Sequence, residues 1–226
     1  MINWSTTDRE GSTRGVKILV YGVSGIGKTC LCATAPRPLI CSAEAGLLSL
    51  KGVSIPVAKI STVEDLTEIH AWAAKSAEAK AFDTICLDSV TEIAEVVLAN
   101  AKKLVRDPRQ AYGELIEKMT LVIRAFRDLQ DKHVYFSAKE EPFRDADGVT
   151  RYGPSMPGKA LGPQLPYFFD EVFAYRTTRT KEGANYRFLQ TSVDLQYVAK
   201  DRSGLLDTAE LPDLGAIILK IQGVKA

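Results

Sequence analysis

The sequence contains few residues that could build a metal or redox centre. It has two histidines and four cysteines among 226 residues, and the cysteines form no C-x-x-C pair. A histidine-based metal site or nucleophile triad is therefore not expected. We interpret Cys30, Cys32, Cys41 and Cys86 as small, reduced, apolar residues, because three of them lie on stretches typical of buried structure.

Long apolar runs and an excess of charge are also lacking. No apolar run approaches the roughly 20 residues that a membrane-spanning helix needs, and residues 1–8 contain no apolar signal core. We therefore expect a cytoplasmic protein without a membrane partner. The net charge of +1 neither indicates nor excludes a nucleic acid, which would need a local basic stripe or one built by repeating the subunit.

The composition that remains is typical of one globular domain. Apolar residues make up 46% of the chain and charged residues 25%. Residues 1–15 are polar and include two glycines, so we expect them to form an N-terminal arm. Residues 16–226 are expected to form a single domain.

One stretch carries a specific phosphate-binding pattern. The apolar run 16–21 is followed by Gly-Val-Ser-Gly-Ile-Gly-Lys-Thr, which has the spacing G-x-x-x-x-G-K-[ST]. Glycines let successive backbone amides turn towards a polyphosphate, and the next helix directs its positive N-terminus at it. Lys28 would reach the terminal phosphates, and the Thr29 hydroxyl would bind Mg²⁺. The alternative is a glycine-rich turn with a surface lysine. The predicted nucleotide-binding residues are Gly22, Val23, Ser24, Gly25, Ile26, Gly27, Lys28, Thr29 and Cys30.

Two acidic residues follow predicted buried strands. The apolar segment 82–87 ends on Asp88, which is the Walker B form, and Asp88 would hold the magnesium ion together with Thr29. Glu44 follows the strand 39–42, at the sheet edge where open parallel sheets place ligands, and could polarise an attacking water. The alternatives are a strand-capping aspartate and a solvated or helix-start glutamate.

Strands and helices alternate through the first 137 residues, and strands follow one another afterwards. This order predicts an α/β fold with a mostly parallel central sheet, flanked by helices and extended by antiparallel C-terminal strands. We therefore expect the core of a P-loop NTPase of the RecA kind. The expected elements include a helix from the capping box Ser61-x-x-Glu64 to about residue 79, helices 91–106 and 110–131, a functional loop or protruding hairpin 139–162, strands 171–178, 185–191 and 195–199, and a helix 213–221.

The order of the motifs also resembles a known family. The G-x-x-G-x-G-K-T loop, the strand ending in Ala-Glu-Ala-Gly and the segment Thr-Ile-Cys-Leu-Asp-Ser resemble the RecA/RadA recombinase core. The chain as a whole resembles the short phage ATPases of that class, the Sak-type single-strand annealing proteins, through residues 154–159, 168–172 and 199–202.

This resemblance implies an ATPase with ATP and Mg²⁺ as cofactors. It would bind single-stranded DNA and promote annealing and homologous recombination of phage DNA in the host cytoplasm. The implied partners are copies of the same chain, in a ring or filament, and a single-strand binding protein. Because the chain lacks the extra domains of full recombinases, annealing is favoured over strand exchange.

The resemblance also implies roles for individual residues. Glu44 matches the water-activating glutamate and Asp88 the Walker B acid, whereas Lys200 and Arg202 resemble basic fingers that reach the nucleotide of a neighbouring subunit. A solvated charged turn is the alternative for the last two. One departure is Ser137-Ala138-Lys139, where RecA proteins have a phosphate-sensing amide.

The DNA contacts implied by the resemblance come from two basic segments. With nearby aromatic residues they could follow phosphates and stack bases, although a solvated helix face and a mobile hairpin explain them equally well. These residues are Lys102, Lys103, Arg106, Arg109, Arg144, Arg151 and Lys159.

Other functions use the same loop. A small-molecule kinase usually needs an arginine-rich lid, and no such cluster is evident. A GTPase needs an Asn-Lys-x-Asp motif, which is missing, so ATP is favoured over GTP. An ATP-dependent accessory or helicase-loader-like module remains an alternative.

Overall fold

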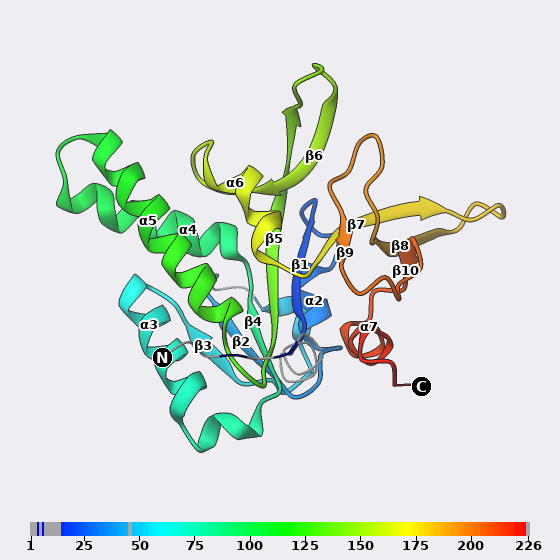
Figure 1. Cartoon of the computed structure of the whole chain (residues 1–226), viewed down its shortest axis with the longest axis horizontal. Coiled ribbons are helices and arrows are strands. Elements are labelled where there is room, and N and C mark those ends of the chain that lie inside the picture. Colours follow the sequence, from blue (N-terminus) through cyan, green and yellow to red (C-terminus); the bar gives the residue numbers. More distant parts are fainter. Residues whose placement is uncertain (1–3, 5, 7–14, 45–46, 225–226) are drawn as a thin grey trace.

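The computed structural model describes residues 4, 6, 15–44 and 47–224. A ten-stranded sheet forms its centre, with helices on both faces (Figure 1). The predicted N-terminal arm lies almost wholly outside the described residues. In chain order the elements are β1 Lys17–Gly22, α2 Lys28–Cys32, β2 Pro38–Ser42, η1 Leu48–Leu50, β3 Val57–Lys59, α3 Val63–Lys75, η2 Glu78–Ala81, β4 Thr84–Leu87, α4 Val90–Leu104, α5 Pro108–Arg127, β5 His133–Arg144, β6 Thr150–Ser155, α6 Leu161–Gln164, η3 Leu165–Phe168, β7 Glu171–Arg179, β8 Asn185–Gln190, β9 Lys200–Asp201, β10 Ala209–Glu210 and α7 Leu214–Ile221.

The sheet is mostly parallel, as predicted. Its order is β10-β8-β7-β1-β5-β4-β2-β3, and the six strands from β7 to β3 run parallel to their neighbours. The antiparallel pairs involve β6, β8, β9 and β10, most of them in the C-terminal part of the chain. Because parallel strands end at a common edge, the loops after β1, β2 and β4 lie at that edge.

Alternation along the strands divides the core into two layers. On β1, Leu19 and Tyr21 face the cluster formed with α3, α4 and α5, whereas Ile18 and Val20 face the cluster formed with α2 and α7. All four side chains are at most 1% exposed. A strand whose two faces are both covered reads as a continuous apolar run, which explains why the segment before the glycine-rich loop was recognisable.

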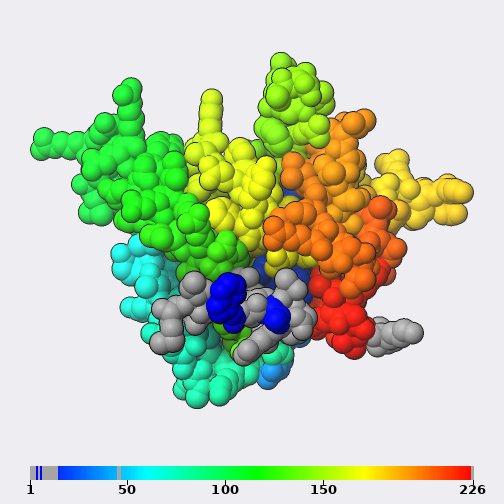
Figure 2. Space-filling view, in the orientation of Figure 1, coloured from blue at the N-terminus to red at the C-terminus, as the bar shows by residue number. Residues whose placement is uncertain are grey.

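Among the segments that project from the body are the α4–α5 connection, the β5–β6 hairpin and the β7–β8 hairpin (Figure 2). The β5–β6 hairpin confirms the expected protruding hairpin within 139–162. It forms because β5 continues past the sheet edge and pairs with β6 from Lys139 to Arg144.

Two sequence-based boundaries were wrong. The expected strand 195–199 is a loop, because the Asp194 carboxylate accepts hydrogen bonds from the amides of Gln196 and Tyr197 at 2.7 and 2.6 Å and bends the chain there. The capping box at α3 uses Thr62 and Asp65, one residue later than predicted, and the helix ends at Lys75.

No helix among the described residues combines the length and apolar character needed to cross a membrane.

Candidate functional site

A cleft of about 1010 Å³ opens at the edge of the sheet where the parallel strands end. Loops from several strands contribute to it, because neighbouring parallel strands deliver their loops to the same place. The lining residues are Gly22, Val23, Ser24, Gly25, Gly27, Lys28, Thr29, Cys30, Ala43, Glu44, Ser49, Asp88, Ser89, Glu92, Lys139, Glu140 and Arg187.

The glycine-rich loop forms one wall of this cleft. Gly27 caps helix α2 with a φ of 113°, a left-handed conformation that favours glycine. The Lys28 ammonium donates hydrogen bonds to the carbonyls of Gly22 and Val23 at 2.7 and 2.9 Å, so the lysine folds over its own loop. Ile26 differs from its neighbours, because its side chain is buried in the core and only its backbone could meet a ligand.

The surroundings of Lys28 change the pKa of its ammonium group. Burial lowers the pKa of its ammonium, and the negative charges of Asp88, Glu140 and Glu44 partly offset this effect. A ligand bringing further negative charge would therefore stabilise the protonated lysine.

Thr29 and Asp88 meet as a magnesium site requires. The Thr29 hydroxyl donates to Asp88 Oδ2 at 2.6 Å, although 59 residues separate the two in the chain. Ser137 Oγ donates to the other oxygen, Asp88 Oδ1, and fixes the carboxylate. A hydroxyl and a carboxylate are hard oxygen donors, and Mg²⁺ usually takes one or two protein ligands and completes its shell with water and phosphate. The residues therefore fit this ion.

Glu44 belongs to a polar chain across the cleft. Its Oε1 accepts a hydrogen bond from Ser89 Oγ at 3.2 Å, and Ser89 Oγ also accepts one from the Glu92 amide at 3.3 Å. Glu92 in turn forms an ion pair with Lys139 at 2.8 Å. Glu44 is exposed, and the adjoining residues Ala45 and Gly46 lie outside the described part of the chain.

Four charged cleft residues were not predicted as site residues: Glu92, Lys139, Glu140 and Arg187. Lys139 enters because Gly22 of β1 lies in register with Lys139 of β5, and Glu140 follows it. Arg187 comes from β8, far along the chain. The sequence offered a signal only for Lys139, which is the first exposed residue after the buried part of β5.

Lys200 and Arg202, the residues predicted as basic fingers, are not among the lining residues of the cleft. The Lys200 ammonium donates hydrogen bonds to the carbonyls of Pro166, at 2.8 Å, and Phe169, and burial lowers its pKa. Arg202 is exposed and forms an ion pair with Asp170 at 3.2 Å. To reach a neighbouring subunit, Lys200 would have to give up both carbonyls and Arg202 would have to leave the exposed Asp170 carboxylate. The finger role stays a prediction.

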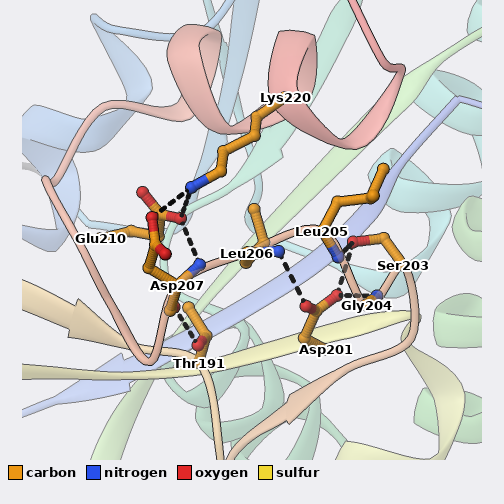
Figure 3. Close-up of polar contacts among 9 residues, drawn as sticks. All are labelled: Thr191, Asp201, Ser203, Gly204, Leu205, Leu206, Asp207, Glu210 and Lys220. Carbon is orange, nitrogen blue, oxygen red and sulfur yellow. Dashed lines mark hydrogen bonds and ion pairs between the residues drawn. The ribbon is translucent and has the colours of Figure 1, made fainter.

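Between these two residues Asp201 organises a tight turn (Figure 3). Its carboxylate accepts hydrogen bonds from Ser203 Oγ at 2.6 Å and from the amides of Gly204 and Leu206 at 3.0 and 3.1 Å. The turn begins on the short strand β9, which pairs antiparallel with β7.

The residues implied in DNA binding lie on two projections. Lys102, Lys103, Arg106 and Arg109 surround the α4–α5 connection, and the Lys102 ammonium lies 5.3 Å from the centre of the Tyr112 ring. The others belong to the β5–β6 hairpin and the loop after it: Arg144, Arg151 and Lys159.

On the hairpin the charges are internally compensated. Arg151 pairs with Asp145 at 2.5 Å. Residues 139–162 contain four basic and four acidic side chains, whereas residues 102–109 contain four basic and one acidic.

Comparison with known proteins identifies the core. The AAA domain family, AAA_24, matches residues 14–203. Among solved structures, the KaiC-like protein PH0186 from the hyperthermophilic archaeon Pyrococcus horikoshii OT3 is 13% identical, covers 78% of both chains and has a TM-score of 0.42. The flagellar accessory protein FlaH from Methanocaldococcus jannaschii is 10% identical, covers 84% of this chain and 85% of its own, and has the same TM-score of 0.42. At this similarity neither carries an argument about activity, and no curated protein matches the chain.

The family match agrees with the geometry described above. The loop, the Thr29–Asp88 contact and the mostly parallel sheet with antiparallel C-terminal strands form a RecA-like P-loop core, as the sequence predicted. The finer resemblance to phage annealing proteins stays a prediction. The chain belongs to the AAA domain family, AAA_24.

Proposed function

We propose that this protein hydrolyses ATP with Mg²⁺, binds single-stranded DNA, and promotes annealing of complementary strands during phage recombination. The observation that carries the proposal is the convergence of Lys28, Thr29, Asp88 and Glu44 on one cleft.

Each of these residues has a distinct task. The loop amides and Lys28 would bind the phosphates, and Thr29 with Asp88 would hold the metal, which supplies charge compensation when bound. Glu44 would orient the attacking water and accept its proton, because its carboxylate projects into the cleft from the strand beside β4. Ser89 would keep that carboxylate in place.

The α4–α5 connection is the stronger candidate for DNA contact. Residues 102–109 contain four basic residues and one acidic residue, and the basic side chains are exposed. One of them, Lys102, lies beside the Tyr112 ring. Such a surface can neutralise phosphates and offer a ring for base stacking. On the hairpin, acidic residues match the basic ones in number, so its electrostatic attraction for phosphates is weaker.

The hairpin is suited to a second task. β5 passes through the cleft at Lys139 and Glu140 and continues directly into the hairpin. A change in the cleft could therefore move the hairpin and alter contacts with DNA or with another copy of the chain. We include a homo-oligomer, ring or filament, in the proposal, with a single-strand binding protein as a further partner.

The test is ATP turnover with and without a single-stranded oligonucleotide, at low and moderate salt. We expect stimulation by the strand that fades as salt rises, because phosphate contacts release counterions. An annealing assay with two complementary fluorescent strands then measures the pairing step itself.

A matched pair of variants locates the DNA surface. Replacing Lys103 and Arg106 by alanine should weaken strand binding by at least about tenfold and reduce its salt dependence. Replacing Lys75 and Lys80, two exposed lysines around the C-terminal end of α3, removes the same charge and should leave binding unchanged.

If the oligonucleotide leaves ATP turnover unchanged at both salt concentrations, the recombination role is refuted. The ATPase would then fit an accessory module that exchanges protein partners, or a small-molecule kinase if an added acceptor became phosphorylated.

A further inference from the structure

We propose that Arg187 binds the α- and β-phosphates of the nucleotide, in cis, from the opposite side of the phosphate-binding loop to Glu44 and Asp88. This inference rests on the proposed nucleotide site and adds a residue that no sequence motif marks.

Arg187 is placed at the loop by the sheet. It lies on β8 in register with Thr177 of β7, and β7 is the direct neighbour of β1. A Cβ built on Gly27 would lie 3.1 Å from Arg187 Nη1 and 3.3 Å from the Tyr175 hydroxyl. The guanidinium therefore stands at the residue that begins helix α2.

The guanidinium lies beside a buried tyrosine. Arg187 Nη1 and the Tyr175 hydroxyl both lie within 3.3 Å of a Cβ built on Gly27, and the Tyr175 side chain is only 5% exposed and packs in the core. Burial raises the pKa of Tyr175 and the nearby arginine charge opposes this rise, which is consistent with close contact. The guanidinium therefore already lies at the loop, which reduces the entropy lost on binding.

Arg187 is also the cation most available in the cleft. Lys28 is bound to two carbonyls of its loop and Lys139 is paired with Glu92, whereas Arg187 has no ion pair within the described part of the chain. Four carboxylates line the same cleft, so a polyphosphate needs additional positive charge there. A guanidinium can meet phosphate oxygens through two parallel hydrogen bonds.

The strand order indicates which phosphates it meets. Glu44 and Asp88 follow β2 and β4 on one side of β1, and Arg187 lies on β8 on the other side. The reacting terminal phosphate must lie near Glu44 and the metal, so the opposite side of the loop faces the α- and β-phosphates.

The experiment compares Arg187→Gln with Arg179→Gln. Arg179 is an exposed arginine on the same hairpin, 3.2 Å from the Asn185 side chain and outside the cleft. Calorimetric titration with Mg-ADP and with a non-hydrolysable Mg-ATP analogue gives both dissociation constants. We expect Arg187→Gln to weaken both by the same factor, roughly 10- to 100-fold, as for loss of a charge-assisted contact. Arg187→Lys should restore part of the affinity, and Arg179→Gln should match the wild type.

The outcomes separate this inference from the proposed function. Equal affinities of Arg187→Gln and wild type would overturn the role of Arg187 alone. A loss confined to the ATP analogue would place Arg187 at the terminal phosphate and overturn the assignment to the α- and β-phosphates. A wild-type protein that binds neither nucleotide would overturn both proposals.

Discussion

Replacing Glu171 by glutamine should remove a loss of folding stability that grows as the pH rises. Glu171 begins β7, is 1% exposed and lies directly opposite Asp201 of β9. Its Oε2 has no hydrogen-bond partner among the described residues. Burial, and secondly the charge of Asp201, raises the pKa of Glu171 from 4.5 to about 8. Burial also acts to raise the pKa of Asp201, but hydrogen bonds from Ser203, Leu206 and Gly204 outweigh it and lower that pKa.

The sign and size of the effect follow from proton linkage. Between pH 4.5 and 8 the folded protein holds the Glu171 proton and the unfolded chain does not, so the free energy of unfolding falls as pH rises. The raised pKa of Glu171 lowers the free energy of unfolding by roughly 3 kcal/mol at pH 7 and by between about 4 and 5 kcal/mol above pH 8. Below pH 4.5 this effect is absent.

Urea unfolding, followed by tryptophan fluorescence from pH 5 to 9, measures this effect. The stability of Glu171→Gln relative to wild type should rise from pH 5 to about pH 8 and then level off, because glutamine keeps the shape without the charge. Glu182→Gln is the control, since Glu182 is exposed in the β7–β8 turn and its pKa is lowered by hydrogen bonds from the Glu182 amide and Thr180. A difference between Glu171→Gln and wild type that stays constant from pH 5 to 9 would refute the reasoning.

Three further predictions concern the cleft, and a fourth concerns Arg202. Lys28→Ala should lower ATP turnover by at least about 100-fold while circular dichroism and thermal midpoint stay unchanged, because the hydrogen bonds of the Lys28 ammonium to described residues go to carbonyls of its own loop; wild-type turnover would contradict the phosphate-binding role. Glu44→Gln should keep nucleotide affinity and lose turnover by on the order of 100-fold or more, whereas loss of binding would indicate a structural residue. Mg-ATP should slow maleimide labelling of Cys30, which lines the cleft and is the exposed cysteine, and should not do so in Lys28→Ala; equal labelling rates would argue against nucleotide at this loop. Arg202→Ala should reduce turnover of the assembled protein, and full activity would eliminate the inter-subunit finger.

Local spacing made most of the cleft predictable. The residues from Gly22 to Thr29 are contiguous, and their glycines and lysine act through backbone geometry that a short pattern describes. Glu44 and Asp88 were predictable because each follows a buried strand, and parallel strands end at one edge.

Boundaries decided by competing local contacts were less predictable. The segment 195–199 has a strand-like composition, but the Asp194 side chain bonds to the backbone amides that a strand would use. Lys200 looked like a surface cation in sequence, whereas folding brings two backbone carbonyls to its ammonium.

The sequence by itself determined the phosphate-binding loop, the order of strands and helices, and hence the RecA-like core, because these depend on residues close together in the chain. Tertiary structure alone decided that Ser137 fixes Asp88, that Lys139 reaches the cleft and that Arg187 stands beside Gly27. The physical reason is strand register. Pairing across the sheet joins residues that are 49 to 160 positions apart, and no local pattern records which side chain a neighbouring strand presents.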